Sequence, residues 1–230
     1  MLVPNNNLIA IAYKTGYCGT LVYNILALSP EVQSYQPINK ISFDDGTAEA
    51  NSECWFNGLH DYDDSLSISE LDWGSYQTIE SRWALSKKKL VTFRCHPNIA
   101  MKLSFIENLK IIYLTHANKY IPERYAYEKI YKQRGDKYFQ NDLKKIFKTT
   151  KTIPITDIIK REILIRNLNH DVVPVENFLK NCFDFKIELL LSKNYQHYLR
   201  LCEFLKITPI NNNYLTSIID SYNSKQWKRF

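Results

Sequence analysis

Short apolar runs alternate with segments of helical periodicity along most of this 230-residue chain. Four runs have the length and β-branched content of buried strands: Leu8–Tyr13, Leu90–Arg94, Lys110–Thr115 and Phe185–Leu191. Helical patterns accompany them at Thr20–Leu28, Tyr76–Lys87, Ile99–Glu107, Pro122–Arg134, Tyr195–Leu205 and Tyr214–Tyr222. This alternation predicts an α/β fold, with a doubly wound, mostly parallel sheet of about four to five strands flanked by helices.

Length and composition indicate a single domain over residues 1–230. A chain of this size with 45% apolar residues can bury one large core and requires no second one. Two segments interrupt the alternation: residues 33–75 are irregular and acidic, and residues 120–183 are polar and mostly helical. The irregular insertion is interpreted either as a surface loop or as a flap over a substrate.

Charge and cysteine content narrow the choice of partners. The formal net charge of +6 suits an anionic ligand, but the basic residues are interspersed, so nucleic acid is not expected as a partner. The five cysteines show no C-x-x-C or Cys/His ligand spacing, so we expect reduced thiols in the cytoplasm and no bound metal. The sequence contains no run of about eighteen apolar residues, so we expect no membrane span.

Two glycines, Gly16 and Gly19, lie between the first apolar run and the first helical pattern. Glycine permits turn conformations and the close approach of an anion, and the N–H groups of Tyr17–Leu21 would be the unpaired donors of a new helix. A phosphate or sulfate would fit there. Thr20 stands where a Walker A loop requires Lys, which disfavours an ordinary kinase or ATPase. A glycine turn that merely joins a strand to a helix is the alternative interpretation.

This segment resembles the 5′-phosphosulfate loop of sulfotransferases that use 3′-phosphoadenosine 5′-phosphosulfate (PAPS). In that family a strand, a loop R/K-S-G-S/T-T/L and a helix ending near a Pro follow one another, and Tyr17–Leu21 and Ser29–Val32 occupy the corresponding places. The segment Val91–Pro97 is similar to the family's K-S/T-H-x-P region, whose His is the catalytic base. The resemblance therefore implies a P-loop-like, nucleotide-binding fold and assigns the role of base to His96.

The third apolar run, within Leu109–Lys119, resembles the family segment that begins the site for the 3′-phosphate of PAPS. His116 then takes the place of the family's Arg, and Arg124 the place of a Ser that binds the same phosphate. Arg124 offers a bidentate fork, so the two changes either compensate or mean that this phosphate is no longer bound. Residues 187–207 resemble the family's late strand and helix. The final basic loop is missing, with only Lys225–Arg229 near its place.

The resemblance implies transfer of a sulfuryl group from PAPS to a hydroxyl or amine of an unidentified acceptor, without a metal. The implied cofactor-binding residues are Gly16, Cys18, Gly19, Thr20, Leu21, Arg94, His116 and Arg124. The residue that supplies the loop's positive charge can be assigned in two ways. Aligned on Gly19, the family's basic residue becomes the neutral Tyr17, and Lys14 or Arg94 would compensate. Aligned on Gly16, Lys14 itself matches the family's K-S-G. Lys14, Tyr17 and His96 are thus the candidate catalytic residues.

Two other functions remain open at this level. A sulfotransferase-like binding protein that has lost the use of PAPS is favoured by Tyr17, by His116 and by the missing terminal loop. A P-loop-like phosphotransferase of another kind is disfavoured because the Walker Lys is missing and no acidic residue suited to hold a metal stands beside a strand. No sequence feature specifies an oligomeric state.

Overall fold

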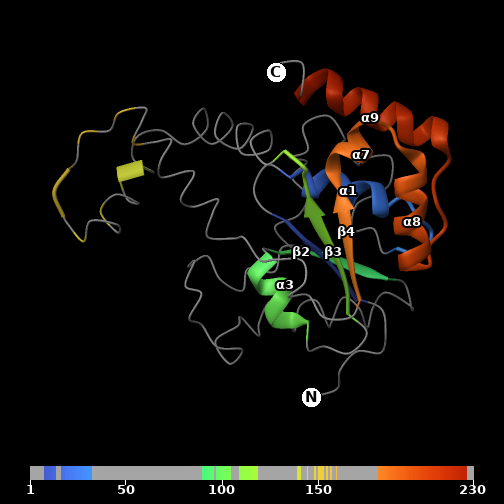
Figure 1. The fold of residues 1–230 in the computed structure, drawn as a ribbon, viewed down its shortest axis with the longest axis horizontal. Helices are drawn as coiled ribbons and strands as arrows, with labels where there is room; N and C mark the ends of the chain where they lie inside the picture. Colours follow the sequence, from blue (N-terminus) through green and yellow to red (C-terminus); the bar gives the residue numbers. More distant parts are fainter. Residues whose placement is uncertain are drawn as a thin grey trace.

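The computed structural model describes residues 8–13, 17–32, 90–95, 97–104, 109–118 and 181–226, with scattered residues between 139 and 159. Strands and helices alternate through the first half of this part, and helices follow one another at its end (Figure 1). The elements are β1 (Leu8–Ala12), α1 (Gly19–Leu26), β2 (Val91–Cys95), α3 (Pro97–Leu103), β3 (Lys110–Thr115), β4 (Cys182–Lys186), α7 (Ile187–Leu191), α8 (Tyr195–Leu205) and α9 (Asn212–Gln226).

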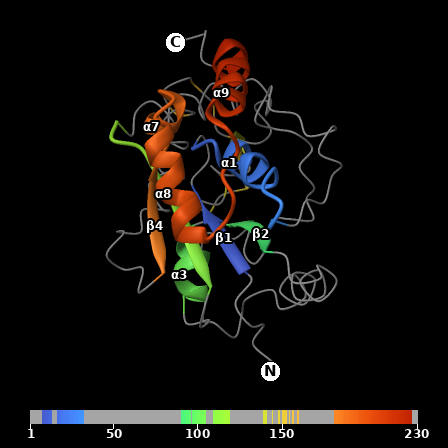
Figure 2. The same ribbon diagram turned by 90° about the vertical axis from the view of Figure 1, so that its right-hand side faces the viewer.

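The four strands form one parallel sheet in the order β2-β1-β3-β4. Strand β1 is central, and its five residues LIAIA are all buried, as expected for a parallel strand covered on both faces. Helix α3 lies on one side of the sheet, and α8 and α9 lie on the other (Figures 1 and 2). The predicted α/β fold with helices around a parallel sheet is confirmed.

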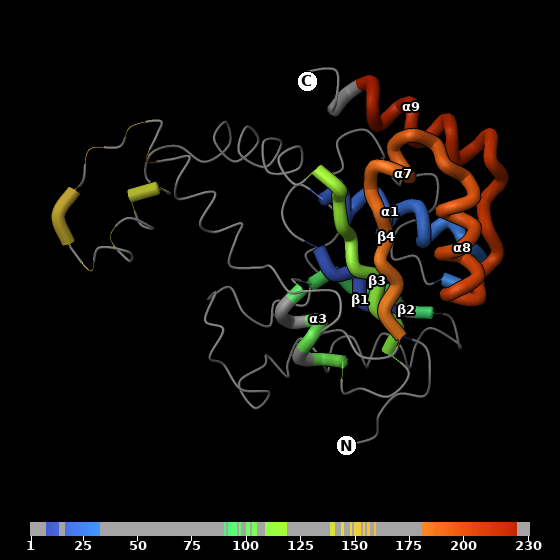
Figure 3. The backbone as a smooth tube through the Cα atoms, viewed as in Figure 1, coloured from blue at the N-terminus to red at the C-terminus, as the bar shows by residue number. Residues whose placement is uncertain are grey.

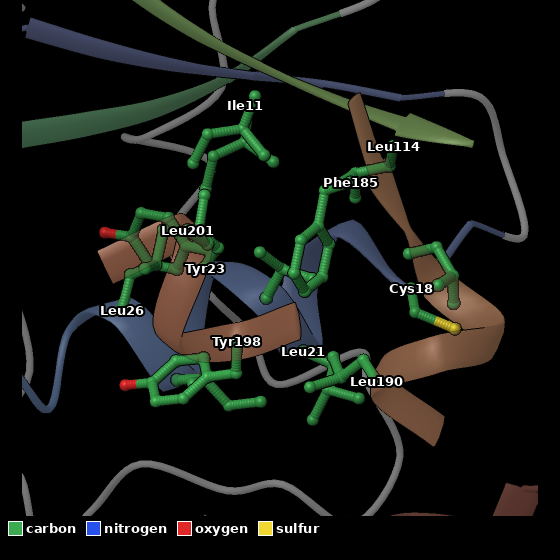
Figure 4. Packing of buried hydrophobic residues seen from close by; sticks show 14 of the residues in the cluster. Ile11, Cys18, Leu21, Tyr23, Leu26, Leu114, Phe185, Leu190, Tyr198 and Leu201 are labelled. Atoms are coloured by element: carbon green, nitrogen blue, oxygen red, sulfur yellow. The ribbon is translucent and has the colours of Figure 1, made fainter. Parts of the chain in front are cut away.

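The main core lies between the sheet and the helices α1, α8 and α9. Alternate residues of the strands, such as Ile11 and Phe185, point toward Leu21 of α1 and toward Tyr198 and Leu201 of α8 (Figure 4). These side chains are at most 1% exposed. Burying each one stabilises the fold by about 1.5–3 kcal/mol, so this side of the sheet anchors α1 firmly.

Several predicted elements agree with the structure, whereas the start of helix α3 and the fourth strand differ from the prediction. The bounds of β3 and α8 are those predicted, and β1, β2, α1 and α9 lie within a few residues of their predicted ranges. Helix α3 begins at Pro97 rather than Ile99, because proline suits the first position of a helix. The predicted helices 76–87 and 122–134, the insertion 33–75 and most of residues 120–183 lie outside the described residues.

The fourth strand was expected at Phe185–Leu191, but β4 covers Cys182–Lys186 and residues 187–191 form helix α7 (Figure 3). In the sequence IELLL, Ile187 and Leu190 are the buried pair, and their spacing of three is helical. A short apolar run cannot be assigned by periodicity alone, which is why the sequence misled. The similarity of this run to the family's late strand is therefore not matched by a strand in the structure.

Candidate functional site

The carboxyl ends of all four strands meet at one edge of the sheet because the strands are parallel. At this edge the Tyr13 N–H donates to the Cys95 carbonyl over 3.1 Å, which joins the ends of β1 and β2. Strand β2, which follows β1 in the chain, lies on one side of β1 in the sheet. Strand β4, which follows β3, lies on the opposite side. Ligands of open α/β sheets bind at such a switch point, outside the carboxyl ends.

Helix α1 begins at this edge with an unusual N-cap. Cys18 adopts the left-handed conformation, with φ 55° and ψ 25°, and makes no side-chain capping bond. The first intrahelical bond runs from the Val22 N–H to the Cys18 carbonyl, at 3.1 Å. The N–H groups of Gly19, Thr20 and Leu21 precede that bond, and they carry the positive end of the helix dipole. This is the arrangement that suits an anion.

Arg94 brings a positive charge to the same turn. Its Nη1 donates to the Thr20 Oγ1 over 2.9 Å, and its guanidinium lies 5.5 Å from the centre of the Tyr23 ring. The register pairs Arg94 with Ile11 of β1, which directs the side chain to the face of the sheet that α1 covers. Arg94 is only 7% exposed, so its charge acts in a poorly solvated environment where it is strong.

Tyr13 fills the space beside Gly19. A Cβ atom at position 19 would overlap the Tyr13 ring, so only glycine fits there. The Tyr13 hydroxyl hydrogen-bonds the side chains of Thr20 and Arg94. Burial raises the pKa of Tyr13 above its usual value of 10.0, and the Arg94 charge offsets part of that rise. Tyr13 is therefore a neutral phenol near pH 7. Its hydroxyl would compete with an anion at the turn for the side chains of Thr20 and Arg94.

The thiol of Cys18 is directed into the core rather than toward the edge. Cys18 packs close to Leu190 (Figure 4), and its Sγ accepts a hydrogen bond from the Tyr222 hydroxyl over 3.2 Å, which links the start of α1 to α9. Tyr17 is 7% exposed and Leu21 is fully buried, and both belong to the main core. Among the described residues of this turn, 17–21, the backbone N–H groups and the Thr20 hydroxyl are the groups suited to meet a ligand.

His116 lies at the end of β3, within a second set of polar contacts. Its Nδ1 accepts from the Asn118 N–H over 2.9 Å, so the neutral ring carries its proton on Nε2. The next residue, Ala117, donates its N–H to the Glu188 Oε1 over 3.0 Å, and the Thr115 hydroxyl donates to Asp184. The carboxylates of Asp184 and Glu188 therefore connect the end of β3 to β4 and α7.

The structure brings together most of the predicted site residues that it describes. Cys18, Gly19, Thr20 and Leu21 form the start of α1, with Tyr17 just before it and Arg94 against Thr20, whereas His116 stands apart at the end of β3. Lys14, Gly16, His96 and Arg124 lie outside the described residues. No group of three or more potential metal ligands occurs among the residues described, and none of their helices is long and apolar enough to cross a membrane.

Sequence reasoning missed Tyr13 and Glu188. Tyr13 follows Ile9 and Ile11 at a spacing of two, which places it on the same face of the strand. That spacing, together with a glycine six residues later, is a signal that was available in the sequence. Glu188 had no such signal, because its contact with Ala117 depends on a helix that the sequence did not predict.

Comparison with known proteins places this chain in no family. No protein-family model matches the sequence, and no curated protein matches it either. The function proposed below therefore rests on the geometry of the turn after β1 and on the residues that resemble the sulfotransferase motifs.

Proposed function

We propose that this chain binds PAPS at the turn between β1 and α1 and transfers the sulfuryl group to a hydroxyl or amine of an acceptor. The observation that carries the proposal is the contact between Arg94 and Thr20, with 2.9 Å from Nη1 to Oγ1. It joins a buried cation, a hydroxyl and the amino end of a helix in one place. Each of these stabilises an anionic oxygen, and together they suit a phosphosulfate.

The contact between Arg94 and Thr20 supports Arg94 as the source of the loop's charge, one of the alternatives that the sequence left open. The sulfotransferase loop carries a basic residue where this chain has Tyr17, and Tyr17 is buried in the apolar core. Arg94 reaches the same turn from the neighbouring strand β2. In the proposed function it replaces the loop's cation and stabilises the charge that develops on the leaving phosphate.

Sulfuryl transfer is a loose in-line displacement, in which the protein mainly positions reactants and stabilises charge. The bond between sulfur and the bridging phosphate oxygen breaks, and sulfur forms a bond to the acceptor's oxygen or nitrogen. The acceptor's proton passes to His96, the base that the resemblance implies. In the sequence His96 directly follows Cys95, the last residue of β2, and the carboxyl end of that strand lies at the edge that carries the turn. The other product is 3′-phosphoadenosine 5′-phosphate (PAP).

A second candidate function is a non-catalytic binding protein that keeps the sheet but no longer uses PAPS. The observation that favours it is the Tyr13 ring, which packs against Gly19 and hydrogen-bonds both Thr20 and Arg94. In the described conformation these two ligand-binding groups already have a partner. Under this alternative Tyr13 fills the turn permanently, whereas under the proposed function an anion displaces its hydroxyl.

Product formation tests the proposal. The full chain is incubated with PAPS and a panel of phenols, sugars and amines, and the release of PAP is measured against a reaction without acceptor. We expect acceptor-dependent release without added magnesium, and its loss in the variant His96→Ala with the thermal stabilisation by PAP retained. The absence of both turnover and stabilisation by PAP would favour the binding protein. Stabilisation by ATP only with magnesium would instead indicate a phosphotransferase.

A further inference from the structure

His197 occupies a junction between elements, outside the proposed PAPS site. It is the third residue of α8, and it is 9% exposed. Its Nε2 accepts a hydrogen bond over 3.0 Å from the N–H of Lys186, the last residue of β4. Helix α7 begins at the very next residue (Figure 3). A single side-chain acceptor therefore holds the backbone at the point where the strand becomes a helix.

The surroundings of His197 favour the neutral ring. It stacks on Phe185 with 4.7 Å between ring centres and 16° between planes, and Phe183 lies 6.0 Å away. The backbone N–H of His197, in the first turn of α8, donates to the Asn194 Oδ1 over 3.1 Å. The positive end of the α8 dipole and the two apolar rings both disfavour an imidazolium at this position.

The neighbouring charges come from three elements. Arg200 lies on the same helix, Lys186 and Asp184 are on β4, and Glu188 is on α7. Burial lowers the pKa of His197 below its ordinary value of 6.5, and the Arg200 and Lys186 charges act in the same direction. The two carboxylates act in the opposite direction without reversing the result.

The junction also holds the end of β3. Glu188, in the first turn of α7, accepts the N–H of Ala117, which follows His116. Asp184 of β4 accepts the hydroxyl of Thr115, the last residue of β3. A change at the point where β4 meets α7 is therefore transmitted to the carboxyl edge of the sheet, near the switch point.

We propose that His197 is a pH-sensitive latch on the β4–α7 junction. In the neutral form, Nε2 accepts the Lys186 N–H and keeps the start of α7 in place. A proton taken up at Nε2 turns this acceptor into a donor that faces another donor, so the hydrogen bond is lost. The junction then opens, and the contact between Glu188 and Ala117 weakens with it. This inference depends on the described fold and not on sulfuryl transfer.

The direction of the pH effect follows from the lowered pKa of His197. Between that lowered value and 6.5 the unfolded chain binds more protons than the folded one, so stability rises with pH in this window. The contribution of the latch is complete above 6.5 and is lost as the pH falls through the folded value. We therefore expect a closed junction near pH 7 and easier opening of the junction as the pH falls below 6.5.

Amide hydrogen exchange of the full chain, followed by NMR, tests the latch. The protection factors of the Lys186 and Ala117 amides in the wild type should fall by several-fold between about pH 7 and pH 5. The variant His197→Gln keeps an acceptor that does not titrate, and it should lose this pH dependence. His116→Gln, a matched control at the same edge of the sheet, should retain it.

A second measurement needs no variant and tests the latch even if His197→Gln does not fold. The ring nitrogens of His197 in the wild type are followed by NMR during a pH titration. The latch requires an unprotonated Nε2 at neutral pH and a transition of the folded protein below 6.5, with protection at Lys186 lost between that transition and 6.5. A proton on Nε2 at neutral pH, a transition at or above 6.5, or equal pH dependence in the wild type and His197→Gln would overturn it.

Discussion

The two halves of the sheet's carboxyl edge carry different chemistry. At the ends of β1 and β2 the polar groups are a buried guanidinium, Arg94, with the hydroxyls of Thr20 and Tyr13 beside it. At the ends of β3 and β4 they are two half-buried carboxylates, Asp184 and Glu188, which accept from neighbouring parts of the chain. The first half has donors that suit an anion, whereas the second uses acceptors that hold neighbouring parts of the chain together. The proposed anion site therefore lies in the first half.

The largest expected effect comes from removing the cation of the first half. The variant Arg94→Met keeps an apolar side chain of similar reach over Tyr23 but supplies neither charge nor donors. We expect PAPS turnover to fall by about 10²–10³-fold, the usual cost of deleting a preorganised group that stabilises transition-state charge. Initial rates of PAP release measure this loss. Arg200→Gln, which removes an exposed arginine from α8, is the matched control, and an equal loss there would contradict the assignment.

The second effect concerns the fit of Tyr13 against Gly19. In Gly19→Ala the added Cβ meets the Tyr13 ring, so we expect a loss of about 1–3 kcal/mol in the free energy of unfolding, as is typical of overpacking. Urea denaturation measures it. In the Tyr13→Ala background the same glycine substitution should cost far less, because the ring is gone. Equal costs in the two backgrounds would show that the ring does not set the need for glycine.

The third effect belongs to the carboxylate half. Glu188→Gln replaces the charged acceptor of the Ala117 N–H by a neutral one, so we expect a loss of about 1 kcal/mol in unfolding free energy. PAP affinity should change by less than about twofold, because the substitution removes no donor from the turn after β1. Calorimetry and urea denaturation measure the two quantities. A large fall in PAP affinity with unchanged stability would erase the distinction between the halves.

The smallest effect comes from the Tyr13 hydroxyl. Tyr13→Phe removes the group that shares Thr20 and Arg94 with a ligand, while the ring still packs against Gly19. If an anion displaces that hydroxyl, its affinity should rise by a few fold, equivalent to about 0.5–1 kcal/mol. Titration with PAP measures the change. A fall in affinity would mean that the phenol contacts the ligand instead of competing with it.

The periodicity of apolar residues was sufficient to predict the elements in which buried residues recur at regular spacing. The apolar run of β3 and the amphipathic pattern of α8 gave bounds that the structure reproduces. The boundary between β4 and α7 was not predictable, because the run IELLL fits either a strand or a helix until its neighbours are known. Tertiary packing, not local preference, makes Ile187 and Leu190 the buried pair.

The residues of the candidate site also divide into those that the sequence indicated and those that it did not. Arg94 was a candidate in the sequence for the charge at the turn; the structure brings its side chain into contact with Thr20, and its role in binding stays a prediction. The spacing along β1 indicated the face on which Tyr13 lies, but its contacts, and the whole role of His197, depend on a specific approach in three dimensions. Tyr13 is set by its distance to Gly19, and His197 by a backbone N–H eleven residues earlier in the chain.

The most direct test of the account is a calorimetric titration of the full chain with PAP, without magnesium, in the wild type, Arg94→Met and Arg200→Gln. The account predicts binding to the wild type, a loss of at least about tenfold in affinity for Arg94→Met, and unchanged affinity for Arg200→Gln. Absence of PAP binding to the folded wild type, or equal affinity in all three proteins, would contradict it.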